Sequence, residues 1–186
     1  KGLLKISRER IFEEFKKIIL SQNIFRVLNE MHKIRVLEII ISDYDLSNLP
    51  ILIKNEKKFF RNSNFLLRFL FLNFKNILFL DNQFPLKRHE KKIIKLYLNF
   101  LQKKISNKEI GYRFGIKLGF IFFTVKNSML GKEVRKEDYN QIFFGSKQIF
   151  PVTNEDLLGF YKPSNEIGKK KKFLESVWIN SYYKFT

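Results

Sequence analysis

The sequence contains no cysteine and no alanine, and it has only one tryptophan and four prolines. The absence of cysteine excludes disulfides, thiolate metal sites and a cysteine nucleophile, and it is compatible with the cytoplasm, where we expect the protein. The depleted residues have G/C-rich codons, whereas most of the enriched residues, such as the 22 phenylalanines, have A/T-rich codons. We therefore attribute part of the lysine content to mutational drift in an A/T-rich genome.

A long uninterrupted apolar segment is also missing. The best candidate for a membrane span, NFLLRFLFLNFKNILFL, contains Arg68, Asn73, Lys75 and Asn76. A span needs about 20 largely apolar residues, and each charge at its centre costs about 2.5–3.5 kcal/mol. We therefore expect a core helix here and no membrane partner. No secretory signal is visible, and because the opening KGLLKISRER lacks methionine we expect a fragment of a longer protein.

Positive charge is present in excess. The chain of 186 residues has 36 Lys and Arg against 18 Asp and Glu, a formal net charge of +18, and its hydrophobic content of 45% is typical of a folded protein. Self-repulsion destabilises a compact chain with this charge unless a polyanion neutralises it. Codon drift neither favours lysine over asparagine nor halves the number of acids. The expected partner is therefore a nucleic acid.

Apolar residues recur at helical spacing through the chain, and the alternation typical of strands is weak. GFIFFTV, Gly119 to Val125, is the stretch that most resembles a strand. We expect an all-α fold, an elongated helical array of one domain or two small ones. The predicted helices are Arg8–Leu20 capped by Ser7, a segment from Asn23 to Ile41, Lys57–Leu80, Leu86–Lys104, a helix from Ser106 or Asn107 to Val125, Arg135–Gly145, and a last helix from Ser164 or Asn165 to Trp178. A loop is expected over Ser42–Pro50.

The C-terminal tail has its own start and stop signals. Thr153 is expected to cap a short helix, with Asp156 three residues later as in a capping box. Gly159 is expected to end that helix, and Pro163 to turn the chain before the last helix.

No residue pattern indicates an active site. Asp43 and Asp45 form a D-x-D pair, but no Gly-Ser precedes it and loop residues follow it, so we interpret both as turn-capping residues and a metal site as the lesser alternative. His32 and His89 lack the neighbouring ligands that a zinc site needs. We predict no catalytic residue and no metal ligand in this chain.

Basic residues form three clusters. One comprises Lys54, Lys57, Lys58 and Arg61. The second, which we call the basic face, comprises Lys87, Arg88, Lys91, Lys92 and Lys95. Their three- and four-residue spacing places them on one side of a helix, opposite Ile93, Leu96 and Phe100. The third, the lysine run, comprises Lys169, Lys170, Lys171 and Lys172 near the start of the last helix, where the helix dipole disfavours cations. A charge cluster is more often a solvated surface, but these clusters together favour contact with RNA phosphates.

Two separated stretches resemble one known family. KISRERIFEEFKKIILSQNIFRVLNEMHKIRVLEIII, residues Lys5–Ile41, resembles the S-x-E-R-I-x-x-E-L-x-K-I-L helix and the following helices of class II tRNA nucleotidyltransferases and bacterial poly(A) polymerases. The residues that match are Ser7, Arg8, Arg10, Ile11, Glu14, Phe15, Lys17 and Ile18. The closing FPVTNEDLLGFYKPSNEIGKKKKFLESVWI resembles the tail of the CCA-adding branch, through Pro151, Val152, Thr153, Asp156, Leu157, Pro163, Ile167, Gly168, Trp178 and Ile179. Asn154 and Ser164 depart from the glycines that the family usually has there.

The resemblance implies the neck remnant, body and tail of an enzyme that adds CCA or adenosines to RNA 3′ ends. It assigns residues 1–50 to neck-derived RNA-binding helices, 51–149 to a helical body and 150–186 to a basic tail. Such a body and tail grip tRNA or another structured RNA through its sugar–phosphate backbone, here through the basic face and the lysine run, with Thr153, Pro163 and Gly168 forming the tail turn. The family's catalytic head lies upstream of the matching positions. The Mg²⁺ and CTP or ATP of the complete enzyme would therefore bind outside this chain, in a head that lies upstream or on a separate chain.

Two alternatives stay open on the sequence. One is a helical protein–protein interaction module that docks a partner through phenylalanine-rich surface. The other is a decayed fragment that folds poorly and has no independent function. The sequence does not distinguish CCA addition from poly(A) addition, since the residues that select the nucleotide are not among the matching positions.

Overall fold

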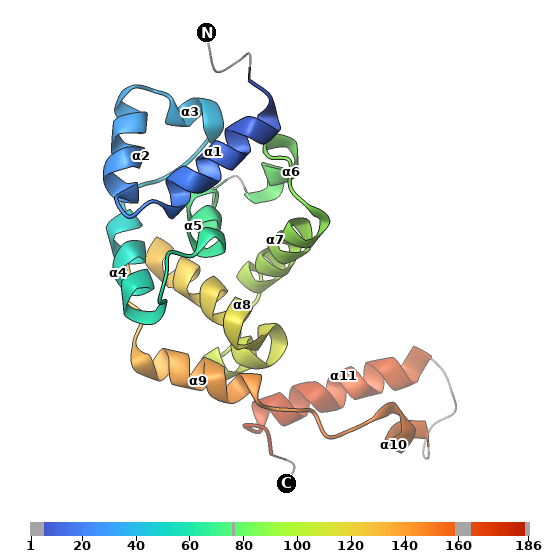
Figure 1. Cartoon of the computed structure of the whole chain (residues 1–186). Helices are drawn as coiled ribbons and strands as arrows, with labels where there is room; N and C mark the ends of the chain where they lie inside the picture. Colours follow the sequence, from blue (N-terminus) through green and yellow to red (C-terminus); the bar gives the residue numbers. More distant parts are fainter. Residues whose placement is uncertain (1–5, 76, 159–164, 185–186) are drawn as a thin grey trace.

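The computed structural model describes residues 6–75, 77–158 and 165–184, and within these ranges the chain is helical and contains no strand. The all-α elongated array expected from the sequence is confirmed (Figure 1). The helices are α1 (Arg8–Leu20), α2 (Ile24–Lys33), α3 (Leu37–Ile40), α4 (Leu49–Phe59), α5 (Phe65–Leu72), the 3₁₀ helix η2 (Ile77–Phe79), α6 (Leu80–Gln83), α7 (Arg88–Leu101), α8 (Asn107–Met129), α9 (Lys136–Ser146), α10 (Asn154–Leu158) and α11 (Asn165–Asn180). No helix in these ranges has the length and apolar character needed to cross a membrane.

The first helix has both of its predicted bounds. The Ser7 hydroxyl accepts a hydrogen bond from the Arg10 backbone N–H at 3.4 Å, which satisfies one of the free donors at the start of α1. The segment that follows contains two helices. α2 ends at Lys33, and Arg35 adopts a positive φ of 57°, a conformation that ends a helix. α3 then begins at Leu37.

The predicted helix Lys57–Leu80 is wrong. α4 begins at Leu49, inside the predicted loop, with Pro50 in its first turn, and it ends at Phe59. A separate helix, α5, begins at Phe65, because the Asn64 side chain accepts a hydrogen bond from the Leu67 N–H at 3.0 Å and caps it. α5 ends at Leu72, so the single helix predicted from Lys57 to Leu80 is interrupted twice.

The bounds predicted for the later helices lie closer to those in the structure. α7 begins two residues after the predicted start and ends three before the predicted end. α8 extends to Met129 and includes the stretch GFIFFTV, although Gly115, with a φ of 71°, kinks it. α9 covers the predicted range to within a residue at each end.

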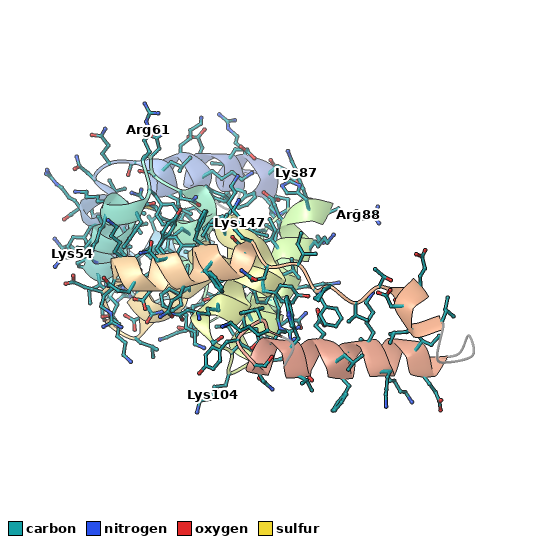
Figure 2. The ribbon with its side chains drawn as sticks, turned by 90° about the horizontal axis from the view of Figure 1, so that it is seen from below. Lys54, Arg61, Lys87, Arg88, Lys104 and Lys147 are labelled. Atoms are coloured by element: carbon teal, nitrogen blue, oxygen red, sulfur yellow. The ribbon has the colours of Figure 1, made fainter. Side chains whose placement is uncertain are left out.

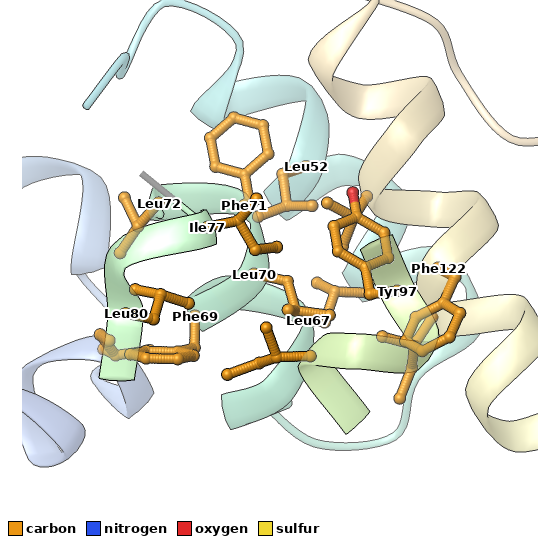
Figure 3. Packing of buried hydrophobic residues seen from close by; sticks show 14 of the residues in the cluster. Leu52, Leu67, Phe69, Leu70, Phe71, Leu72, Ile77, Leu80, Tyr97 and Phe122 are labelled. Carbon is orange, nitrogen blue, oxygen red and sulfur yellow. The ribbon is translucent and has the colours of Figure 1, made fainter. Parts of the chain in front are cut away.

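One hydrophobic core extends from Phe12 in α1 to Ile142 in α9. α5 lies at its centre, because apart from Arg68 this short helix is apolar, and Leu67 to Leu72 are buried. Figure 3 shows Leu67 and Leu70 between Leu80 on one side and Tyr97 and Phe122 on the other. The first three helices therefore share their core with the helices that follow them.

The tail forms an arm that projects from the base of the body (Figure 1). Its buried residues Leu157, Trp178 and Ile179 lie outside the main core. The ring of Trp178 packs against Tyr112 of α8 at 5.5 Å between centroids. The Tyr112 hydroxyl donates a hydrogen bond to Glu175 at 2.5 Å, and burial together with this carboxylate raises the pKa of Tyr112 above its usual value. Aromatic packing and one hydrogen bond thus hold α11 against α8.

The predicted cap of the short tail helix is confirmed. The Thr153 N–H donates to Asp156 Oδ2 at 2.7 Å, and the Asp156 N–H donates to the Thr153 hydroxyl at 3.2 Å, the two reciprocal bonds of a capping box. The predicted helix end at Gly159 and the turn at Pro163 lie outside the described residues.

Candidate nucleic-acid interface

The basic face occupies the side of α7 that turns away from the core. Ile94, Tyr97 and Phe100 are buried on the other side of this helix and fix its rotation. As a result Lys87, Arg88, Lys92 and Lys95 are exposed and Lys91 is half-buried. The spacing predicted one positive surface here, and the structure places these five residues together as predicted.

A hollow of about 860 Å³ lies against this surface. The described residues that line it are Lys87, Arg88, His89, Lys91, Lys92 and Lys95. From the sequence, His89 was a candidate only for a metal ligand or a catalytic group. In the structure His89 lies next to Arg88 in the first turn of α7, beside the cations of the basic face. The lining residues thus include no carboxylate among the side chains that the structure describes.

The single acid of α7, Glu90, does not neutralise the basic face. Its Oε2 accepts a hydrogen bond from the Lys87 backbone N–H at 2.7 Å, and its Oε1 lies 4.0 Å from Lys16 Nζ on α1. Arg88, Lys92 and Lys95 form no ion pair with a carboxylate whose side chain is described. Their charges are therefore available to an external anion.

The lysine run lies on the arm, in the N-terminal half of α11. Lys169, Lys170 and Lys172 are exposed. Lys171 is half-buried, and its ammonium group donates to Asn154 Oδ1 at 3.0 Å, so this lysine also holds α10 against α11. Successive residues of a helix point about 100° apart, so the run surrounds the arm with positive charge and does not form one face.

The remaining tail-turn residues are placed as follows. Thr153 caps α10, and Pro163 lies outside the described residues. Gly168 lies in the first turns of α11, and the space that a Cβ would occupy there is open. The structure therefore gives Gly168 no role in a tight turn.

The basic face and the arm lie on the same side of the molecule. In Figure 1 α7 forms the right edge of the body and α11 extends below it toward the same side. Figure 2, from below, again shows Lys87 and Arg88 on the side toward which α11 projects. Two positively charged elements, α7 and α11, therefore extend toward the same side of the molecule.

A groove of about 420 Å³ lies where α7, α8 and α11 meet. Its lining includes Asn99 and Lys103 from the C-terminal part of α7 and its end, and Arg113 from α8. Asn99 and Lys103 continue the four-residue spacing from Lys95, a signal in the sequence that our reading missed. Arg113 is also paired with Glu109, at 2.6 Å between Nε and Oε1.

The first basic cluster is not part of this surface. Figure 2 shows Lys54 on the opposite side from Lys87 and Arg88. Lys54 pairs with Glu133 at 2.5 Å, and Lys58 donates to the Val134 carbonyl at 3.2 Å. These two lysines connect α4 to the loop before α9, and contact between the first cluster and RNA stays a prediction.

Asp45 has the local role expected of a turn residue, whereas Asp43 pairs with a distant lysine. Asp45 Oδ1 accepts the Ser47 N–H at 2.8 Å, and hydrogen bonds from Ser47 hold the pKa of Asp45 below its usual value. Asp43 Oδ1 lies 3.6 Å from Lys75 Nζ. Across the described part of the chain no three His, Asp or Glu side chains group in a way that could hold a metal ion.

Comparison with known families finds a match at the N-terminus. Residues 1–46 match the model of a family described as the probable RNA and SrmB-binding site of polymerase A. The match covers α1, α2, α3 and the start of the next loop. Comparison with curated proteins and with solved structures finds no match. The N-terminal helices are thus similar to the RNA-binding region of polymerase A, which supports an RNA-binding role at that level.

Proposed function

We propose that this chain is the RNA-binding part of a polymerase A-like protein and that it holds structured RNA by its sugar–phosphate backbone. The observation that carries the proposal is the basic face, a set of cations along α7 whose hollow has no carboxylate among the described residues that line it. Phosphates are the partner that such a surface favours, and contacts to phosphates position RNA without reading its sequence. The similarity of residues 1–46 to an RNA-binding region supports the same conclusion independently.

Within this proposal the RNA is tRNA, and the complete protein is a CCA-adding tRNA nucleotidyltransferase. The resemblance of the tail to the CCA-adding branch supports this choice, with a poly(A) polymerase as the other member of the family. The angle between α7 and the arm would receive the tRNA, with the lysine run on one side of the duplex and the basic face on the other. The protein would then recognise the shape of the RNA and contact its sugar–phosphate backbone.

Catalysis is assigned elsewhere in this proposal. Nucleotidyl transfer with Mg²⁺ and CTP or ATP would be carried out by a head domain, and the present residues would contribute RNA binding only. We place this activity in the cytoplasm. The isolated chain is then expected to bind tRNA and to incorporate no nucleotide.

The test is the salt dependence of tRNA binding. Fluorescence anisotropy between 50 and 200 mM salt is expected to give a linear fall of log K with log salt, with a slope of about −0.7 to −0.9 for each phosphate contacted. The double variant Lys92→Gln/Lys95→Gln should reduce the steepness of that slope by about 2, because each lysine neutralises about one phosphate.

Lys54→Gln is the matched control, since it removes one lysine on the opposite side, and its exposed ion pair contributes little to stability. It should bind tRNA as the wild type does. An affinity that stays constant across this salt range would overturn the proposal. If Lys54→Gln lost as much tRNA affinity as the double variant Lys92→Gln/Lys95→Gln, the assignment of phosphate binding to the basic face would be wrong.

A further inference from the structure

A second hollow, of about 420 Å³, lies between α2 and the loop that follows α3. We call it the α2 pocket. Its lining residues are Phe25, Asn29, His32, Tyr44, Asp45, Leu46 and Ser47. None of them belongs to the basic face or the lysine run, and in Figure 1 α2 lies on the opposite side of the body from α7. The α2 pocket is therefore separate from the surface proposed to bind the backbone.

The helix side of the α2 pocket is formed by regular spacing. Phe25, Asn29 and His32 occur at i, i+4 and i+7, which places them on one face of α2. Ile24 and Leu28, on the neighbouring face, are fully buried and fix the rotation of the helix. The three lining side chains consequently point toward the loop in a defined order.

The loop side is held by hydrogen bonds. His32 Nδ1 lies 2.7 Å from the Tyr44 hydroxyl, and the two rings meet edge to face with 5.8 Å between their centroids. The bond between the Ser47 N–H and Asp45 Oδ1, 2.8 Å long, fixes the turn that follows. The walls of the α2 pocket are thus connected to each other before any ligand binds, which lowers the entropy lost on binding.

The lining combines aromatic rings with hydrogen-bonding groups. Phe25 is 42% exposed, so a large apolar ring stays in water although the main core is close. Asn29 offers both an amide donor and an amide acceptor at the same site. A ligand that matches this lining has a flat π face and polar edges, which are the properties of a nucleobase. Bases of single-stranded RNA are commonly held in this way, stacked on an aromatic ring and hydrogen-bonded at the edge.

We propose that the α2 pocket holds one unstacked base of single-stranded RNA, stacked on Phe25 and hydrogen-bonded at its edge by the polar groups that line the site. This inference rests on the proposed RNA-binding function and adds a second kind of contact to it. The basic face neutralises phosphates of any RNA, whereas the α2 pocket accepts only a base that is free of a duplex. Single-stranded and duplex RNA should accordingly respond differently to changes in the pocket.

The experiment compares a single-stranded 12-nucleotide oligoadenylate with a 12-base-pair RNA duplex as ligands of the purified chain. Phe25→Ala is expected to weaken binding of the single strand by roughly 5- to 160-fold, which corresponds to the loss of about 1–3 kcal/mol for one stacked base. Binding of the duplex should stay unchanged, since its bases are already stacked and paired. Phe25→Tyr keeps the ring and should retain the affinity of the wild type for both ligands.

Phe79→Ala is the matched control, because Phe79 is another exposed phenylalanine, 62% accessible, outside the α2 pocket. It should leave both affinities unchanged. His32→Ala, a second variant of an exposed residue, should weaken only the single strand, and it keeps the inference testable if Phe25→Ala unfolds. Thermal unfolding by circular dichroism identifies a variant that has lost its fold.

Two results would overturn the inference. One is wild-type affinity of Phe25→Ala and His32→Ala for the single strand. The other is an equal loss of affinity for the single strand and for the duplex in variants that remain folded. Neither result concerns the salt dependence of duplex or tRNA binding by the wild type, which tests the proposed function separately. Suppose that the tRNA affinity of the wild type is independent of salt, but Phe25→Ala still weakens binding of the single strand. The proposed backbone contacts would then be wrong, and the proposed base-binding role of the α2 pocket would stand.

Discussion

Arg68 of α5 and Glu56 of α4 form a buried ion pair, with 2.6 Å between Nη2 and Oε2 and side chains only 4% and 3% exposed. Arg68 Nη1 also donates to the backbone carbonyls of Ile19 and Ser21 at 2.6 and 2.9 Å, where α1 ends. Glu56 Oε1 accepts the Asn64 N–H at 2.7 Å. The Arg68 guanidinium therefore connects the end of α1, which lies in the segment that matches the family model, to α4 and α5.

Replacing one partner of this pair should destabilise the fold strongly. Arg68→Met leaves the buried Glu56 carboxylate without its cation and the Ile19 and Ser21 carbonyls without this donor, and we expect a loss of about 3–5 kcal/mol in the free energy of unfolding. The double variant Arg68→Met/Glu56→Leu should lose less than Arg68→Met alone, since no unpaired charge is left buried. Urea unfolding followed by circular dichroism measures both. A double variant less stable than Arg68→Met would contradict this account of the pair.

The sequence predicted part of this arrangement. Arg68 was read correctly as a residue that prevents a membrane span and belongs to a buried helix. Its partners could not be found in the same way, because Glu56 lies on another helix and Ile19 is 49 positions away along the chain. Local caps such as Ser7 and the Thr153–Asp156 pair are readable because donor and acceptor are three residues apart. The break between α4 and α5 was readable too, because Arg61, Asn62, Ser63 and Asn64 form a polar run typical of a loop, and the predicted helix ran through it.

The crossing of α8 and α9 depends on two glycines. A Cβ on Gly145 would overlap the Lys108 carbonyl, and a Cβ on Gly111 would overlap the Ile142 carbonyl. In both cases the obstacle is backbone, so the helices would have to separate. We expect Gly145→Ala to cost about 1–3 kcal/mol or more, as measured by chemical denaturation. Gly168→Ala is the matched control, because the space beside Gly168 is open, and it should not destabilise the chain. A stable Gly145→Ala protein would show that the crossing is looser than described.

The arm should detach before the body unfolds. Trp178 is the single tryptophan, and it packs against Tyr112, Tyr183 and Phe150, outside the main core. Few buried contacts give a segment low local stability. We expect the emission of Trp178 to shift to the red at a lower urea concentration than the loss of helical circular dichroism. Glu175→Gln, which weakens the bond from Tyr112, should enlarge that difference. Coincident transitions in the wild type would show that arm and body unfold as one unit.

The cap of α10 makes the tail sensitive to acid. Hydrogen bonds from the Thr153 backbone and hydroxyl lower the pKa of Asp156. Because the folded pKa lies below the unfolded value of about 3.9, the cap stabilises the helix above that pH, and the contribution is lost as the pH falls through the folded pKa. The Thr153 amide resonance should therefore titrate with a midpoint below 3.9 in NMR spectra. Asp156→Asn should abolish that titration, and a midpoint above 3.9 would contradict the cap.

The basic face was predictable for a simple reason, since helical spacing fixes which side chains share a side of α7. For the first cluster, spacing does not reveal that Lys54 and Lys58 have partners in a loop about 80 residues later. The α2 pocket could not be predicted from the sequence for the same reason. His32 and Tyr44 come from different elements, and neither residue alone forms a motif.

A last prediction concerns the continuity of the surface between the basic face and the arm. Lys103 lines the groove where α7, α8 and α11 meet, whereas its neighbour Lys104 does not line it. Figure 2 shows Lys104 at the lower edge of the molecule, away from Lys87 and Arg88. If RNA passes from the basic face to the lysine run, Lys103→Gln should weaken tRNA binding and reduce the steepness of the salt dependence by about 1, and Lys104→Gln should change neither. The two variants have the same charge and composition, so a difference between them depends on position alone. Equal behaviour would mean that the RNA contacts the basic face and the arm, or one of them, without crossing the groove.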